Sequence, residues 1–106
     1  MRILLDECVD QRLRLLFEGH ESESAAYAGF TGLKNGELLN AAEGAGFEVI
    51  VTTDQEIPYQ QNLAARRISL LVLCAPTNRL ADLRGLLPSA LEALKAIVPG
   101  QVVRVG

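Results

Sequence analysis

A short, unbroken apolar run near the start of the chain ends at two acids. Ile3, Leu4 and Leu5 are followed directly by Asp6 and Glu7. A strand with one face in water alternates apolar and polar residues, so a continuous apolar run predicts a strand that is buried on both faces. Such strands belong to parallel sheets with helices on both faces. The run therefore predicts an α/β fold, with Asp6 at the end of a buried strand.

Strand-like and helix-like segments alternate along the rest of the chain. Further strands are predicted at residues 20–24, 47–52, 68–73 and 101–105, although the first of these is poor in strand formers. Helical patterns are predicted for residues 13–18, 35–45, 62–67, 80–87 and 88–96, with Asn35 as an N-cap. Short connections between such elements predict an α/β three-layer sandwich with a mainly parallel five-stranded sheet. We expect one domain, spanning residues 1–106.

Composition narrows the class of protein. The chain has 106 residues, of which 49% are hydrophobic and 22% charged, which is typical of a globular domain. No apolar run is long enough to span a membrane and no signal-peptide pattern is present, so we expect a cytoplasmic protein without a membrane partner. The net charge of −3 argues against binding nucleic acid through bulk attraction. Contacts with phosphates would need a local basic rim.

Several acids are expected at one edge of the sheet. Asp6, Glu7 and Asp54 follow predicted strands, and Glu37 lies in the first turn of a predicted helix. Clustered carboxylates repel one another unless a cation neutralises them, and oxygen ligands without His or Cys favour Mg²⁺ or Mn²⁺. Such an ion lowers the pKa of bound water and orients a phosphodiester for attack. The pattern predicts metal-assisted hydrolysis of a phosphate ester.

Each acid also has a simpler role. Asp6 can cap the helix that follows it, Glu37 can favour a helix dipole, and Glu7 can face solvent. Asp54 has the weakest alternative explanation, because it ends a second apolar strand in the same way as Asp6 ends the first.

Three segments, in order, resemble the small PIN-like proteins of uncharacterised function. The segments are Ile-Leu-Leu-Asp-Glu at residues 3–7, Gly-Leu-Lys-Asn-Gly-Glu-Leu-Leu at residues 32–39, and Val-Thr-Thr-Asp at residues 51–54. These are short bacterial relatives of the PIN-domain nucleases, which include the VapC-type toxins. The resemblance covers nearly the whole chain.

The resemblance implies a sheet in the order 3-2-1-4-5 and an acidic pocket that binds Mg²⁺ or Mn²⁺ and cleaves RNA. It makes Asp6, Glu37 and Asp54 the catalytic and metal-binding residues. Glu7, directly after Asp6, is a further candidate metal ligand. It also implies a toxin neutralised by an antitoxin protein, and a homodimer. Many PIN nucleases have a fourth acid, for which this chain offers no obvious match.

Four other residues are candidates for binding the substrate. Gln61 and Asn62 carry amide groups close to the Asp54 loop, Asn78 follows the fourth strand, and Arg67 is a candidate for the basic rim. A solvated loop, a turn former and an ordinary surface arginine are the simpler interpretations of these residues.

Two other classes of function compete with a nuclease. A binding module that kept a PIN-like scaffold and lost catalysis agrees with the missing fourth acid and the acidic net charge. A phospho-acceptor receiver domain also has acids after the first strand, an aspartate after the third and a hydroxyl near the fourth, as Asp6, Asp54 and Thr77 provide. A receiver domain needs a lysine after its fifth strand, and residues 101–106 contain none.

Overall fold

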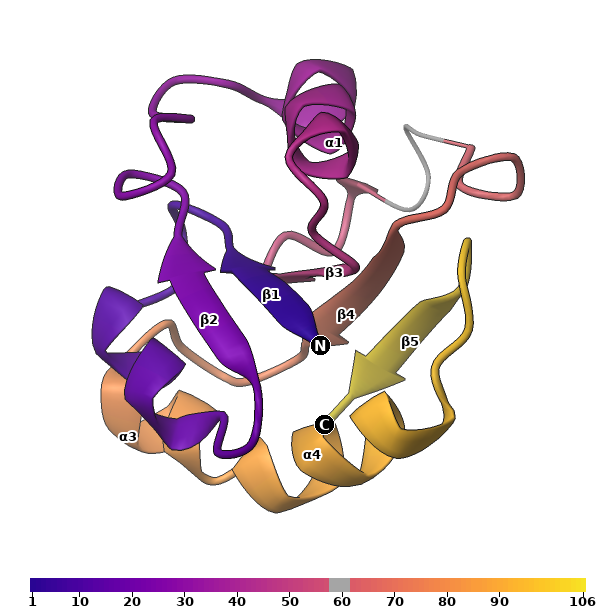
Figure 1. Ribbon diagram of the computed structural model, residues 1–106. Coiled ribbons are helices and arrows are strands. Elements are labelled where there is room, and N and C mark those ends of the chain that lie inside the picture. The colour runs from indigo at the N-terminus through magenta and orange to yellow at the C-terminus, as the bar shows by residue number, and fades with distance from the viewer. Residues whose placement is uncertain (58–61) are drawn as a thin grey trace.

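The computed structural model describes residues 1–57 and 62–106 (Figure 1). In this part of the chain, five strands form one open sheet in which every pair of neighbours is parallel. The strands are β1 (Arg2–Leu5), β2 (Glu21–Ser24), β3 (Val49–Thr52), β4 (Ser69–Leu73) and β5 (Val102–Val105). The predicted α/β class with a mainly parallel five-stranded sheet is confirmed.

The strand order is β2-β1-β3-β4-β5, so the expected order 3-2-1-4-5 is wrong. β3 lies inside the sheet, between β1 and β4, and β2 lies at the edge. The residues explain this arrangement. All four residues of β3 are buried, whereas the Glu-Ser-Glu-Ser sequence of β2 is suited to an edge that water reaches.

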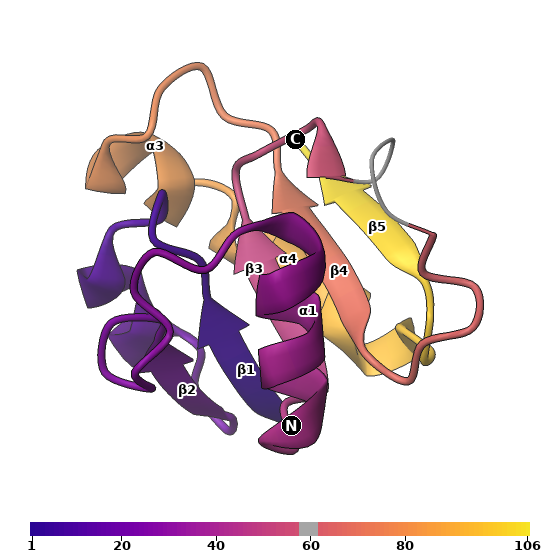
Figure 2. The same ribbon diagram turned by 90° about the horizontal axis from the view of Figure 1, so that it is seen from above.

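Helices cover both faces of the sheet, as Figures 1 and 2 show. The 3₁₀ helix η1 (Gln11–Leu16), α3 (Leu80–Arg84) and α4 (Leu87–Ala96) pack on one face, and α1 (Asn35–Gly44) packs on the other. Successive strand residues point to opposite faces. Ile3 and Leu5 therefore belong to the core beneath η1, α3 and α4, whereas Leu4 belongs to the core beneath α1.

Two predicted helices differ from those in the structure. Residues 11–16 form a 3₁₀ helix that starts with a hydrogen bond from the Leu13 N–H to the Asp10 carbonyl. Residues 62–67 form turns, because the Asn62 side chain accepts the Ala64 N–H and so competes with helix formation. The helix α1 begins at Asn35, with Lys34 rather than Asn35 in the N-cap position.

None of the helices among the described residues is long and apolar enough to cross a lipid bilayer.

Candidate functional site

The two aspartates that end apolar strands lie at the point where the chain changes direction across the sheet. Asp6 follows β1 and Asp54 follows β3, and these two strands are parallel neighbours. From β1 the chain runs to β2 at one edge, and from β3 it runs to β4 on the other side. In open parallel sheets, ligands bind in the crevice outside the carboxyl ends of two such strands.

The hydroxyl of Thr52 joins the two aspartates. Thr52 is completely buried at the end of β3, and its Oγ1 donates to Asp6 Oδ2 at 2.8 Å. The same oxygen accepts the backbone N–H of Asp54 at 3.0 Å. The other Asp6 oxygen, Oδ1, accepts the Glu7 N–H at 2.8 Å. These hydrogen bonds fix the direction of the Asp6 carboxylate and the path of the chain into Asp54.

Asp54 also shapes its own loop. Its Oδ1 accepts the N–H of Glu56 at 2.9 Å, which is the geometry of an Asx turn. Its other carboxylate oxygen has no partner among the described residues. Asp54 therefore acts as a turn former and still presents an oxygen for a ligand.

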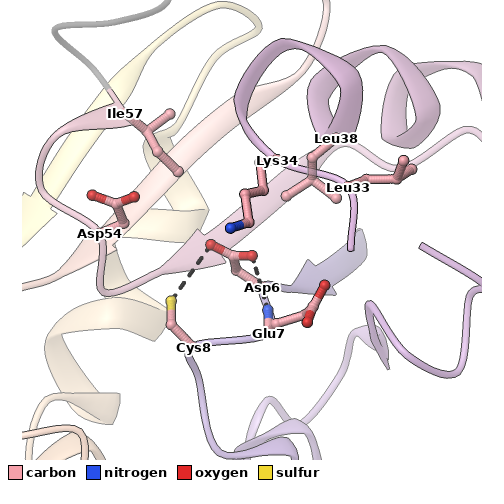
Figure 3. Close-up of a pocket in the computed structure, with 8 residues that line it drawn as sticks. All are labelled: Asp6, Glu7, Cys8, Leu33, Lys34, Leu38, Asp54 and Ile57. Atoms are coloured by element: carbon pink, nitrogen blue, oxygen red, sulfur yellow. Dashed lines mark hydrogen bonds between the residues drawn. The ribbon is translucent and has the colours of Figure 1, made fainter. Parts of the chain in front are cut away.

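Both aspartates line a hollow of about 270 Å³ beneath the start of α1 (Figure 3). Its walls are three acids, one thiol, one amine and three apolar side chains: Asp6, Glu7, Cys8, Leu33, Lys34, Leu38, Asp54 and Ile57. The apolar side chains come mainly from α1 and the loop before it. The site therefore combines charged groups at the sheet edge with a partly apolar roof.

Lys34 brings a positive charge to this hollow. Its ammonium points toward the Asp6 carboxylate in Figure 3, but it forms no ion pair or hydrogen bond with the described part of the chain. Lys34 is held at the N-cap of α1 by the loop that precedes it. That loop is tied to β1 because Glu7 Oε1 accepts the Gly32 N–H at 2.6 Å.

Cys8 forms part of the same hydrogen-bonded group. Its Sγ lies 3.4 Å from Asp6 Oδ2 and 3.4 Å from Thr52 Oγ1, and it accepts the Thr53 hydroxyl at 3.2 Å. Both cysteines, Cys8 and Cys74, are free thiols. The exposed Cys8 thiol therefore supports the position of Asp6 from the side opposite Lys34 (Figure 3).

Other predicted ligands contribute less to the hollow than the two aspartates. Glu7 lines it, but one of its oxygens is occupied by Gly32. Glu37 is exposed in the first turn of α1 and is not among the lining residues. Asn78 is exposed in the loop after β4, at the same edge of the sheet, and also lies outside the hollow.

Arg67 and Asn62, two of the predicted substrate-binding residues, do not line this hollow. Arg67 precedes β4, so it lies at the amino ends of the strands, about 15 Å away along a five-residue strand. Its backbone N–H donates to Glu43 Oε2 at 3.0 Å. The side chain of Asn62 closes the turn at residues 62–64. Gln61 lies outside the residues that the structure describes.

The residues fit a divalent ion only in part. Within residues 1–57 and 62–106, no group of three or more His, Cys, Asp or Glu side chains is placed to hold a metal ion. The expected trio of Asp6, Glu37 and Asp54 is therefore not assembled as a ligand set. Two carboxylates at one hollow still suit Mg²⁺, which keeps several of its waters and often takes only one or two protein carboxylates besides a substrate phosphate.

Several residues of the site were not predicted from the sequence, Thr52 and Lys34 among them. Thr52 was part of an apolar run, and its signal was a hydroxyl at the buried end of a strand, two residues before an acid. Lys34 was part of the segment that carried the PIN-like resemblance, and its signal was its place directly before a helix start.

No model of a known protein family, no curated protein and no solved structure matches this chain.

Proposed function

We propose that the protein is a Mg²⁺- or Mn²⁺-dependent ribonuclease of PIN type, in which Asp6 and Asp54 hold a single ion. The observation that carries this proposal is the hydroxyl of Thr52, which joins the two aspartates at the edge of one hollow. A buried hydroxyl that orients one acid and the backbone of another is what a site needs to keep two carboxylates in fixed positions.

The side chains around the hollow have separate roles in the proposed reaction. A bound divalent ion would supply Lewis acidity and an activated water. Asp6, held by Thr52 and the Glu7 N–H, would orient that ion together with Asp54, one of whose oxygens has no partner among the described residues. Lys34 would neutralise charge on the phosphodiester, because its ammonium has no carboxylate partner in the described chain. We assign Glu37 no direct contact with the ion.

The first test is calorimetric titration with Mn²⁺, followed by cleavage of a mixed RNA by the same samples. Asp54→Asn and Asp6→Asn should each weaken Mn²⁺ binding at least tenfold and abolish cleavage, because each removes one of two charged ligands. Glu92→Gln is the control, since Glu92 forms an exposed ion pair with Lys95 in α4.

The variant Glu37→Gln distinguishes the proposed two-aspartate site from the three-acid site that the PIN-like resemblance implies. It should change Mn²⁺ affinity less than threefold if the ion is held as proposed. A loss as large as that of Asp54→Asn would restore Glu37 as a ligand. Wild-type protein that binds no divalent ion would refute the proposal, and binding without cleavage would favour the PIN-like binding module.

A phospho-acceptor is the second candidate, and the strand order favours it. The order 2-1-3-4-5 is that of the doubly wound folds that include receiver domains, whose ligands bind at the same switch point. Thr77 counts against it, because its hydroxyl donates to the Asp82 carboxylate rather than reaching the hollow. Incubation with acetyl phosphate and Mg²⁺, followed by intact-mass measurement, decides between the two. A phosphorylated Asp54 without RNA cleavage would identify the phospho-acceptor.

We also propose that the nuclease is the toxin of a toxin–antitoxin pair. The supporting observations are those of the site itself, together with the resemblance at residues 3–7, 32–39 and 51–54. Expression of the wild type in a bacterial host should slow growth, whereas Asp54→Asn should not. Equal growth of the two cultures at equal expression would count against the toxin role.

A further inference from the structure

A groove continues from the acidic hollow across the end of β1 and towards η1. A second hollow, of about 370 Å³, shares Asp6 and Glu7 with the first. A third, of about 360 Å³, shares Gln11 and Ser24 with the second. The three hollows therefore adjoin one another along a path from Asp54 to β2, and we refer to them together as the groove.

The far end of this path is a mixed polar and aromatic surface, which we name the Tyr27 subsite. Its residues are Gln11, Arg14, Ser22, Glu23, Ser24 and Tyr27. They come from η1, from β2 and from the turn that follows β2. Residues from both η1 and the β2 region therefore contribute to the Tyr27 subsite.

Tyr27 presents its ring to solvent. The residue is 82% exposed, and its backbone is fixed because its N–H donates to Ser24 Oγ at 3.1 Å. Within the described chain, no other aromatic ring and no cation lies against the ring. An aromatic ring on a fixed backbone with an open face suits the stacking of a planar ligand.

Arg14 supplies a cation to the same subsite. Its guanidinium forms no hydrogen bond or ion pair with the described residues. Its neighbour Arg12 differs, because it is bound to Asp10 at 2.7 Å. Glu23 also lines the hollow, but it pairs with Leu4, so its side chain points towards the other face of the sheet. A ligand that suits Tyr27 and Arg14 has a planar ring and an anionic group, and a nucleotide has both.

We propose that the Tyr27 subsite binds one nucleotide of a single-stranded RNA whose chain follows the groove to Asp6 and Asp54. The base stacks on Tyr27, and the phosphate of the same nucleotide contacts Arg14. This inference rests on the proposed function, since it takes the RNA substrate of the Asp6–Asp54 site to lie in the groove.

The acids in the middle of the groove do not prevent an RNA chain from lying there. The hydrogen bonds and the charge of Arg12 hold the pKa of Asp10 to about 2, so that carboxylate is ionised and paired. Glu7 is engaged by the Gly32 N–H. Both oxygens of Asp6 are engaged as well, by the Thr52 hydroxyl and by the Glu7 N–H. The overall charge of −3 makes such local contacts necessary for a polyanion.

The subsite can be tested without the ion. Fluorescence anisotropy measures the binding of a labelled ten-nucleotide RNA of mixed sequence in EDTA at low salt. Tyr27→Ala should weaken binding by about tenfold, as the loss of one stacked base does, and Tyr27→Phe should bind as the wild type does. Leu15→Ala is the control for truncating an exposed apolar side chain, because Leu15 lies on η1 outside the subsite.

Arg14→Gln should weaken binding several-fold and reduce the dependence of affinity on salt by about one phosphate contact. Arg84→Gln makes the same change of charge on α3 and should do neither. Unchanged RNA affinity in both Tyr27→Ala and Arg14→Gln would overturn the subsite. Wild-type protein that binds a lysine-rich peptide and no RNA would also overturn it, and would make the groove a docking surface for a protein.

Failure of the subsite and failure of the nuclease can be distinguished. Asp54→Asn should keep its RNA affinity in EDTA while losing Mn²⁺-dependent cleavage. In the active enzyme, Tyr27→Ala should raise KM and leave kcat nearly unchanged, because the stacking contact is made equally in the ground and transition states. Cleavage with an unchanged KM would refute the subsite and leave the nuclease in place.

Discussion

At the scale of single residues, the buried hydroxyl of Thr52 determines how Asp6 and Asp54 stand relative to each other. It donates to one carboxylate and accepts a backbone N–H beside the other. A methyl group in place of this hydroxyl would leave a partly buried N–H without its acceptor. Asp6 would keep the Glu7 N–H as its fixed partner, together with the weaker thiol of Cys8.

Thr52→Val should therefore lower the free energy of unfolding by about 1–2 kcal/mol, because one buried hydrogen-bonded hydroxyl is lost and its partner is left unsatisfied. Mn²⁺ affinity should fall as well, since Asp6 loses its orientation. Urea unfolding and calorimetry measure the two effects. Thr52→Ser keeps the hydroxyl, so it should retain Mn²⁺ affinity, and an equal loss in both variants would contradict the role given to the hydroxyl.

A second residue-scale contact holds α1 to the turns before β4. Glu43 Oε1 accepts Arg66 Nη1 at 2.7 Å, with side chains that are 17% and 21% exposed, and its Oε2 accepts the Arg67 N–H. Burial alone would raise the pKa of Glu43. The hydrogen bonds from Arg66 and from the Arg67 backbone, with the charges of both arginines, lower that pKa overall.

This shift predicts a dependence of stability on pH. Because the pKa of Glu43 is lower in the folded chain, its ionised form adds stability at neutral pH, and that share is lost as the pH falls through the lowered pKa. Glu43→Gln should lower the free energy of unfolding by about 1 kcal/mol at neutral pH and by much less at about pH 2. Urea titrations at the two pH values measure this, with the exposed Glu92→Gln as the control. An equal difference at both pH values would contradict the prediction.

At the scale of elements, the turn that enters β5 leaves room only for glycine. Gly100 has a φ of +79°, and a Cβ there would lie 2.8 Å from the carbonyl oxygen of Leu63. That oxygen belongs to the segment that leads into β4, so Gly100 sets how closely the starts of two neighbouring strands approach.

Gly100→Ala should lower the free energy of unfolding by about 2 kcal/mol, because the added carbon meets backbone and the φ angle is strained. Gly44→Ala is the matched control. Gly44 ends α1 with no atom within 4 Å of the added carbon, so the same substitution there should raise stability by about 0.5–1 kcal/mol. Thermal unfolding should shift in opposite directions for the two variants, and a shift in one direction for both would refute the assignment.

The positions of the strands were predictable, whereas their order was not. Apolar runs such as residues 47–52 and 68–73 carry a local signal, since a buried strand must be apolar on both faces. Pairing depends on contacts between distant segments. The polar composition of β2 pointed to an edge, but the PIN-like resemblance placed that strand inside the sheet.

The site was predictable to the same extent. Asp6 and Asp54 share the hollow because they follow two neighbouring parallel strands within two residues, and the topology brings such residues together. Glu37 is carried by a helix whose position depends on the loop before it, and that loop is anchored by the hydrogen bond between Glu7 and Gly32. No local pattern encodes an anchor between residues so far apart.

At the scale of the whole molecule, we propose a homodimer. The large apolar side chains that remain exposed among the described residues are Met1, Leu15, Tyr27 and Val98, and they come from separate parts of the sequence. Light scattering at micromolar concentration should give twice the mass of one chain. A monomer at this concentration would contradict the proposal and leave these side chains as isolated surface residues.

The Glu-Ser-Glu-Ser sequence of β2 has a consequence for any attempt to improve this chain. Its outer backbone groups face no other strand in the described part of the chain, and an unpaired edge is a template onto which a second molecule can add. Replacing Glu21 and Glu23 by valine would raise β-propensity and remove the charges that repel an incoming strand. Valine substitutions chosen to stabilise β2 would therefore promote fibrillar aggregation.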